Sequence, residues 1–166
     1  MFGFESKAST TAELYHDLHR AIDAVTADEP DPVANMANAA ALIWEYLPDL
    51  IWAGFYRLVE IGLVLGPFQG KVACIRIAIG SGVCGSAAAT LKTQRVDDVH
   101  AFPGHIACDG ASQSELVVPI TRDGQLIAVL DLDSPFLARF DADDARGCEA
   151  IATLLSHRIA PQRDGS

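Results

Sequence analysis

The sequence has 166 residues, which fits one domain of ordinary size, and half of them are hydrophobic, which argues against disorder. Twelve basic against 22 acidic residues give a net charge of −10, which disfavours nucleic acid and anionic membranes as partners. No apolar run approaches the roughly 20 residues of a membrane-spanning helix, and the start, MFGFESKAST, lacks the pattern of a signal peptide. We therefore expect a cytoplasmic protein.

Two helices are predicted in the first 48 residues. The first should begin near Thr10, because TTAE offers a capping box between Thr10 and Glu13. Apolar residues then recur at helical spacing, at Leu14, Leu18, Ala21, Ile22 and Val25. The second helix should have Asp31 as its cap and Pro32 in its first turn, and it should stop before Pro48.

From residue 51 the pattern changes to short strands. Strands are expected at residues 51–59, 62–68 and 73–79, then a tight turn into a short helix at 80–92, a brief edge strand within 94–100, and a hairpin at 115–133. Asp141 should cap a last helix that runs to about residue 159. Short connections favour an α+β fold, in which an antiparallel sheet carries the N- and C-terminal helices on one face. We expect one domain at residues 10–159 between tails at 1–9 and 160–166.

The hairpin register predicts a cluster of acids. A three-residue loop at 122–124, with Gly124 left-handed in a bulge, gives one strand face that is wholly apolar: Leu116, Val118, Ile120, Leu126, Ala128, Leu130 and Leu132. A two-residue loop would pair Leu116 with Asp131 and place an acid among the leucines, at a cost of several kcal/mol. The first register gathers Glu115, Asp131 and Asp133 at one end of the opposite face. This cluster is either a solvated sheet end or a pocket floor that retains a proton near neutral pH.

Four cysteines are present without any C-x-x-C motif, so a zinc ribbon or a thioredoxin-like pair is not indicated. Cys148 falls on the inner side of a predicted helix and is expected to be a packed core residue. Cys74 opens a predicted strand, and Cys84 lies near a helix N-terminus, where the macrodipole can lower the pKa of a thiol. Cys108 lies in a polar loop with little to pack against. The pattern suggests an attacking cysteine with one or two resolving cysteines, against the alternative that each thiol is structural.

A metal site is the weaker interpretation of the same loop. His100, His105 and Cys108 lie close in sequence, and zinc could use them with Cys84 or Cys74. The His-x4-His-x2-Cys spacing matches no strong zinc pattern, and histidines in loops more often form hydrogen bonds. We therefore expect no metal.

Two aromatic residues share one face of the first predicted strand. Trp52 and Tyr56 are four residues apart, and strand side chains alternate with a period of two. Such a pair either packs in the core or forms an aromatic wall for a methyl, sulfur or ammonium group of a ligand.

Taken together, these segments resemble the free methionine-(R)-sulfoxide reductases, which are stand-alone GAF-fold enzymes. The resemblance covers roughly residues 10–158 and is carried by WAGFY, LVLGPFQGKVACIRI, GVCGSAAAT, VDDVHAFPGHIACD, SELVVPI and VLDLDSP. It implies a GAF-like fold, the reduction of free L-methionine (R)-sulfoxide, and no organic cofactor. The family also implies thioredoxin, reduced by NADPH, as the reductant, and a homodimer as the assembly. The rival interpretation is a GAF sensor module that binds a small ligand without chemistry.

The resemblance also implies roles for individual residues. Cys108 matches the cysteine that attacks the sulfoxide, Cys74 matches its disulfide partner, and Cys84 matches a third cysteine that assists resolution or recycling. The pocket residues that it implies are the acids Glu115, Asp131 and Asp133 and the aromatic residues Trp52 and Tyr56. A proton held on Glu115 or Asp133 would make the sulfoxide a better electrophile. Which acid donates, and whether Cys74 or Cys84 is the main resolving cysteine, the sequence leaves open.

Overall fold

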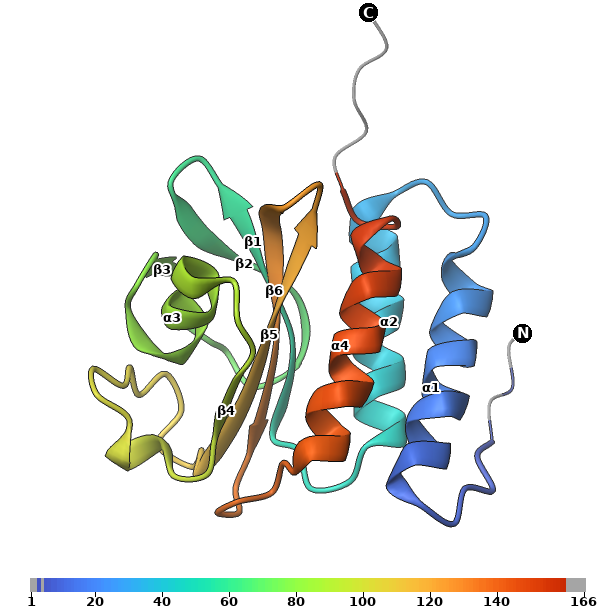
Figure 1. Ribbon diagram of the computed structural model, residues 1–166, viewed down its shortest axis with the longest axis horizontal. Helices are drawn as coiled ribbons and strands as arrows, with labels where there is room; N and C mark the ends of the chain where they lie inside the picture. The colour runs from blue at the N-terminus through green and yellow to red at the C-terminus, as the bar shows by residue number, and fades with distance from the viewer. Residues whose placement is uncertain (1–2, 4, 161–166) are drawn as a thin grey trace, which may run out of the picture.

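The computed structural model describes residue 3 and residues 5–160 (Figure 1). Within this part, a six-stranded sheet separates three long helices on one face from a short helix and a long loop on the other. The helices are α1 (Thr11–Thr26), α2 (Pro32–Tyr46), α3 (Gly82–Thr90) and α4 (Ala142–Ser156). The strands are β1 (Trp52–Val59), β2 (Gly62–Gly70), β3 (Arg76–Ala78), β4 (Gln94–Val96), β5 (Ser114–Arg122) and β6 (Gln125–Ser134), with a 3₁₀ turn η1 (Val99–Ala101) between β4 and β5.

The strands are ordered β3-β2-β1-β6-β5-β4, and every neighbouring pair is antiparallel. The two central strands, β1 and β6, therefore come from opposite halves of the chain. This arrangement confirms the predicted α+β class with the N- and C-terminal helices on one face. The boundaries at residues 10 and 159 stay a prediction, and positions 1, 2, 4 and 161–166 of the two tails lie outside the described residues.

The helix starts follow their capping residues. Thr10 caps α1 by accepting a hydrogen bond from the Glu13 backbone N–H at 3.2 Å. The Glu13 carboxylate bonds the Ser9 backbone N–H instead of that of Thr10, so the reciprocal half of the predicted capping box is displaced by one residue. Asp31 caps α2 with Pro32 in the first turn, as predicted. None of the helices in the described part of the chain has the length and apolar character that crossing a membrane requires.

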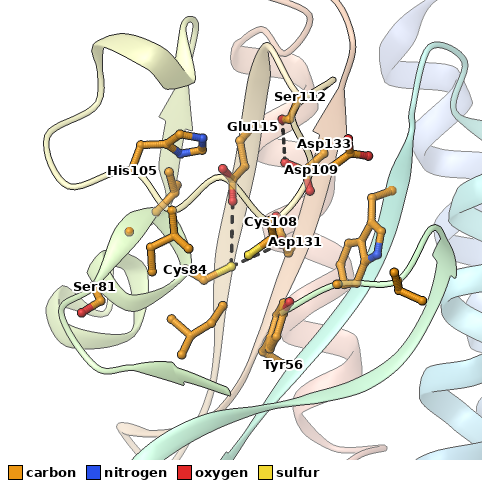
Figure 2. Close-up of a pocket in the computed structure, with 17 residues that line it drawn as sticks. Tyr56, Ser81, Cys84, His105, Cys108, Asp109, Ser112, Glu115, Asp131 and Asp133 are labelled. Carbon is orange, nitrogen blue, oxygen red and sulfur yellow. Dashed lines mark hydrogen bonds between the residues drawn. The ribbon is translucent and has the colours of Figure 1, made fainter. Parts of the chain in front are cut away.

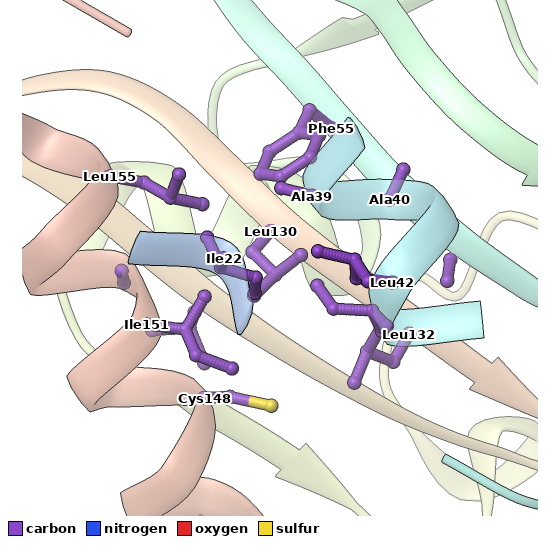
Figure 3. Close-up of a cluster of buried hydrophobic side chains, with 14 of the residues drawn as sticks. Ile22, Ala39, Ala40, Leu42, Phe55, Leu130, Leu132, Cys148, Ile151 and Leu155 are labelled. Atoms are coloured by element: carbon purple, nitrogen blue, oxygen red, sulfur yellow. The ribbon is translucent and has the colours of Figure 1, made fainter. Parts of the chain in front are cut away.

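The main core lies between the sheet and the three long helices (Figure 3). Helices α2 and α4 pack on the strands, and α1 packs across both of them. Side chains of this core include Leu130 and Leu132 from β6, Ile151 and Leu155 from α4, and Phe55 from β1. Cys148 is fully buried here, as expected for a packed cysteine. Burial of each such side chain contributes about 1.5–3 kcal/mol to the stability of the fold. Because this core occupies one face of the sheet, only the opposite face is left for a site.

The β5–β6 hairpin corrects one prediction. Its loop has two residues, Asp123 and Gly124, both with positive φ, and Arg122 pairs with Gln125. A bulge at Ile127 then shifts the register, so that Ile120 pairs with Ala128 and Leu116 with Leu132. Beyond the bulge the side chains lie on the predicted faces, although the pairs are two residues from those that a loop at 122–124 implies. The predicted loop length was therefore wrong, but the bulge restores the alternation of faces that the apolar row requires.

The same bulge changes the position of two side chains. Leu126 packs in the cluster on the α3 side of the sheet, not in the leucine row where it was predicted. Ile127 packs against the main core instead. Both corrections are confined to the loop end of the hairpin, so the end that carries the acids is unaffected.

Candidate active site

Three carboxylates meet on the sheet face opposite the long helices. Glu115 on β5 pairs with Asp133 on β6, and Asp131 lies two residues before Asp133, opposite Val117. Side chains two apart in a strand share a face, so all three point to the side covered by α3. Figure 2 shows the three carboxylates grouped between α3 and the loop that precedes β5. The structure thus brings together the acids that the register predicted.

These acids are not a solvated sheet end. Glu115 and Asp131 are 7% and 5% exposed, and Asp133 is half-buried. Burial, and then repulsion by Asp131 and Asp133, raises the pKa of Glu115 well above its ordinary value. Burial also raises the pKa of Asp133, and raises that of Asp131 to about 6. A cluster of this kind retains a proton near neutral pH, which favours the pocket-floor interpretation.

Cys84 is in direct contact with this cluster. It lies in the first turn of α3, and its thiol donates to Asp131 Oδ2 at 3.3 Å, with Glu115 Oε1 at 3.9 Å (Figure 2). Burial, followed by the charges of Asp131 and Glu115, raises the pKa of the Cys84 thiol well above its ordinary value. The helix N-terminus was expected to lower that pKa. Desolvation and two neighbouring acids outweigh the dipole of a helix of nine residues.

Trp52 and Tyr56 line the pocket and also hold its wall. Their rings stack with centroids 5.8 Å apart. Trp52 Nε1 donates to the carbonyl of Lys71 at 3.1 Å, and the Tyr56 hydroxyl donates to the carbonyl of Cys74 at 2.9 Å. The two side chains therefore fix the segment after β2 that carries Cys74. Sequence reasoning missed this anchoring role, because the pattern of a strand shows which face a ring lies on but not which backbone carbonyl it reaches.

A disulfide joins Cys74 to Cys108, with a Cα–Cα distance of 5.6 Å across 34 residues of sequence. Cys108 is exposed and lines the pocket, while Cys74 is half-buried. Cys74 lies before β3 rather than in it, because that strand is only three residues long. The disulfide links the two segments that border the mouth of the pocket, one after β2 and one before β5.

The pocket encloses about 580 Å³ of empty space, including the part open to solvent. Its floor is the acid cluster with Cys84, one wall is aromatic, and the loop at residues 105–112 forms another. The start of α3 contributes its N-cap residue Ser81 and, from the first turn, Gly82 and Val83. Gly82 has φ +63°, and a side chain there would press on Ile106, so glycine lets the loop lie close over the helix.

Some pocket residues escaped the sequence analysis. Ser112 is buried and donates to Asp133 Oδ1 at 3.0 Å, and Asp109 also lines the pocket. The signal available was a run of small polar residues directly before Glu115. That run indicated a loop, but it did not indicate which of its hydroxyl groups turns inward.

The structure does not assemble the metal set considered from sequence. Cys74 and Cys108 are bonded to each other, so neither can be a thiolate ligand, and the His100 and His105 rings lie 6.2 Å apart. A different trio could geometrically approach a cation, since one ligand atom from each of Cys84, Glu115 and Asp131 lies within 4.8 Å of the others. Ligation would require the Cys84 thiol and the Glu115 carboxyl to lose their protons, which their burial opposes.

Fold and pocket together define a GAF domain, and the family model for the GAF domain matches residues 35–160. The chain is 49% identical over 148 residues to the free methionine-R-sulfoxide reductase of Escherichia coli, covering 89% of this chain and 90% of that protein. It is 43% identical over 152 residues to the Saccharomyces cerevisiae protein of the same name, covering 87% and 84%. The chain therefore belongs to the free methionine-(R)-sulfoxide reductase family.

A solved structure supports the same assignment. The free methionine-R-sulfoxide reductase of Neisseria meningitidis, in complex with its substrate, superposes with a TM-score of 0.92 at 46% identity and covers 96% of both chains. This confirms the predicted GAF-like fold and the predicted family.

Proposed function

We propose that this protein reduces free L-methionine (R)-sulfoxide to L-methionine, with Cys108 as the attacking thiol. One observation carries the proposal: an exposed cysteine, already paired with a second cysteine, lies at the mouth of a pocket floored by proton-retaining acids. The names of the Escherichia coli and yeast relatives support the same substrate.

The chemistry balances without a cofactor. In the reduced protein the Cys108 thiolate attacks the sulfoxide sulfur while an acid of the cluster protonates the sulfoxide oxygen. The oxygen passes to Cys108 as a sulfenic acid, methionine leaves, and the sulfoxide has gained the two electrons that Cys108 has lost. The Cys74 thiolate then attacks the sulfenic acid, which releases water and forms the Cys74–Cys108 disulfide. The position of that disulfide supports Cys74 as the resolving cysteine.

The pocket offers a matching group for each part of the substrate. Asp131 Oδ1 is buried without a hydrogen-bond partner among the described residues, which suits it to accept from the ammonium group. Trp52 and Tyr56 provide an apolar wall for the side chain and its methyl group. The first turn of a helix leaves backbone N–H groups without intrahelical partners, so the start of α3 suits the carboxylate. The proton donor is then Glu115 or Asp133.

Recycling requires an external dithiol, because each turnover takes two electrons from the protein and leaves the Cys74–Cys108 disulfide, and the other two cysteines, Cys84 and Cys148, are buried. We expect thioredoxin, reduced by NADPH, to attack the exposed Cys108 side of the disulfide. The resemblance to the family also leads us to expect a cytoplasmic homodimer, and light scattering after gel filtration would test the assembly.

The test is a coupled assay with thioredoxin, thioredoxin reductase and NADPH, in which the free R and S sulfoxides are supplied separately. We expect NADPH consumption with the R epimer alone, none from Cys108→Ser, and about one methionine per chain from reduced Cys74→Ser in a single turnover. The absence of consumption with the R epimer would refute the proposal.

A GAF sensor for a nucleotide is disfavoured by the pocket itself. The described residues that line the pocket include no Lys or Arg. They do include four acids: Asp109, Glu115, Asp131 and Asp133. Such a surface repels phosphate. Thermal shift with cyclic nucleotides against methionine sulfoxide separates the two functions.

A further inference from the structure

We propose that Cys84 is a positioning residue that stays a thiol throughout turnover and holds Asp131 by donating its proton to that carboxylate. The inference rests on the proposed function for its catalytic consequences, but its central claim is a hydrogen bond that can be measured without turnover. It differs from the role in resolution or recycling that the sequence suggested for Cys84.

The contacts define which group donates. A carboxylate can only accept, and a thiol has one proton, so the 3.3 Å contact is a bond from Cys84 to Asp131 Oδ2. The 3.9 Å approach to Glu115 Oε1 is the weaker of the two. Because Cys84 is 5% exposed and fixed by the first turn of α3, the thiol has little freedom to turn away.

Two observations argue against a redox role. The disulfide joins Cys74 to Cys108 and leaves Cys84 as a free thiol, and the Cys84 sulfur contacts two carboxylates. Thiol–disulfide exchange and attack on a sulfenic acid both need a thiolate. A thiolate at this position would be a third negative charge in a buried acidic cluster, which burial and the two acids oppose.

The bond has a consequence for the two oxygens of Asp131. Oδ2 is occupied by the thiol, and Oδ1 is left as a buried acceptor without a partner in the described part of the chain. A donor to the ionised form also favours ionisation of Asp131, which leaves the retained proton to Glu115 or Asp133. Cys84 therefore prepares Asp131 as the anionic acceptor for a cationic group.

Other titratable groups face the same cluster. They are Tyr56 from β1, Asp133 from β6, and His105 and Asp109 from the loop before β5. None of these four is a hydrogen-bond donor to Asp131, but Glu115 is, and its bond lowers the pKa of Asp131 more than the bond from Cys84 does. Loss of the Cys84 proton should therefore raise the pKa of Asp131 while the bond from Glu115 persists.

The first experiment follows the Asp131 carboxyl by carbon-13 NMR titration in the wild type, Cys84→Ser and Cys84→Ala. Serine keeps a donor and alanine removes it. We expect the Asp131 pKa to rise in Cys84→Ala, because the ionised form loses its donor, and to stay close to the wild-type value in Cys84→Ser. An unchanged pKa in Cys84→Ala, or equal shifts in both variants, overturns the proposal. This titration needs no substrate, so its failure is distinct from failure of the proposed function.

The second experiment uses the wild type alone, so it does not depend on a variant that folds. Reduced protein is oxidised with one equivalent of methionine (R)-sulfoxide, or with hydrogen peroxide if that sulfoxide does not react. Free thiols are then alkylated after denaturation and mapped by mass spectrometry. We expect Cys84 to be alkylated and Cys74 to be linked to Cys108. Cys84 recovered in a disulfide overturns the proposal.

Turnover gives the kinetic signature. For Cys84→Ala we expect KM for the sulfoxide to rise about tenfold and the acid limb of kcat/KM to move to higher pH, with disulfide formation intact. Cys84→Ser should restore both. Loss of disulfide formation in both variants would instead assign Cys84 to resolution and contradict the inference.

Discussion

The disulfide predicts a large change in stability when the protein turns over once. Oxidation of the reduced protein by one equivalent of substrate closes a loop of 34 residues between Cys74 and Cys108. In the chain-entropy model, the cost of closing a loop of this length in the unfolded chain is about 3.8 kcal/mol at 25 °C. For a chain of 166 residues each kcal/mol raises Tm by about 2–4 °C, so the expected increase is about 8–15 °C.

The assay is differential scanning calorimetry of the reduced protein before and after one equivalent of methionine (R)-sulfoxide, with excess substrate removed. Cys74→Ser is the matched control, because it can accept the oxygen but cannot close the loop, and its Tm should stay within a few degrees. If mass spectrometry shows the disulfide in the wild type while Tm is unchanged, then the reduced unfolded chain is already constrained, and the reasoning from loop entropy is wrong.

Three further predictions concern single side chains. Glu115→Gln should lower kcat/KM by about 10²–10⁴-fold, and no loss would exclude Glu115 as the donor. Burial raises the pKa of Glu115, so the free energy of unfolding of the wild type should fall as pH rises above about 4.5. In Glu115→Gln the free energy of unfolding, measured in urea, should depend less on pH. Tyr56→Phe loses the bond to the Cys74 carbonyl and should slow disulfide formation about 2- to 10-fold in rapid-quench measurements; an unchanged rate would contradict the anchoring role. Gly147→Ala should lower the free energy of unfolding, measured in urea, by about 1–3 kcal/mol, because its methyl group would overlap the buried tyrosine ring of α1. Gly110→Ala is the control, because a methyl group there meets open space and should change that free energy little. Equal losses in the two variants would contradict this packing.

Much of the fold follows from local signals in the sequence. Helix starts at Thr10, Asp31 and Asp141 could be predicted because a cap is a contact between residues three apart. The acid cluster could be predicted because an ionised Glu115 or Asp131 in a leucine row is too costly to occur.

The remaining features of the site depend on contacts between distant segments. The bond from Cys84 to Asp131 spans 47 residues, and that from Tyr56 to Cys74 spans 18. No spacing rule connects such pairs. The same limit applies to the pKa of Cys84, since the local helix dipole predicted a lower value, whereas burial and then the acids on β5 and β6 raise it.

The bulge at Ile127 has a consequence for how this protein can change in length. The loop at Asp123 and Gly124 and the bulge together keep the carboxylates on one side of the sheet and the leucines on the other. A single residue inserted or deleted in β6 between the bulge and Asp131 would exchange the two sides at the acids unless a second change of one residue compensated it, whereas the loop can absorb an extra residue by becoming longer. Descendants of this gene should therefore gain or lose residues in this part of β6 in even numbers, or else in pairs of compensating events. A comparison across related genes of the number of residues in this part of β6 would reveal that constraint as a preference for one parity.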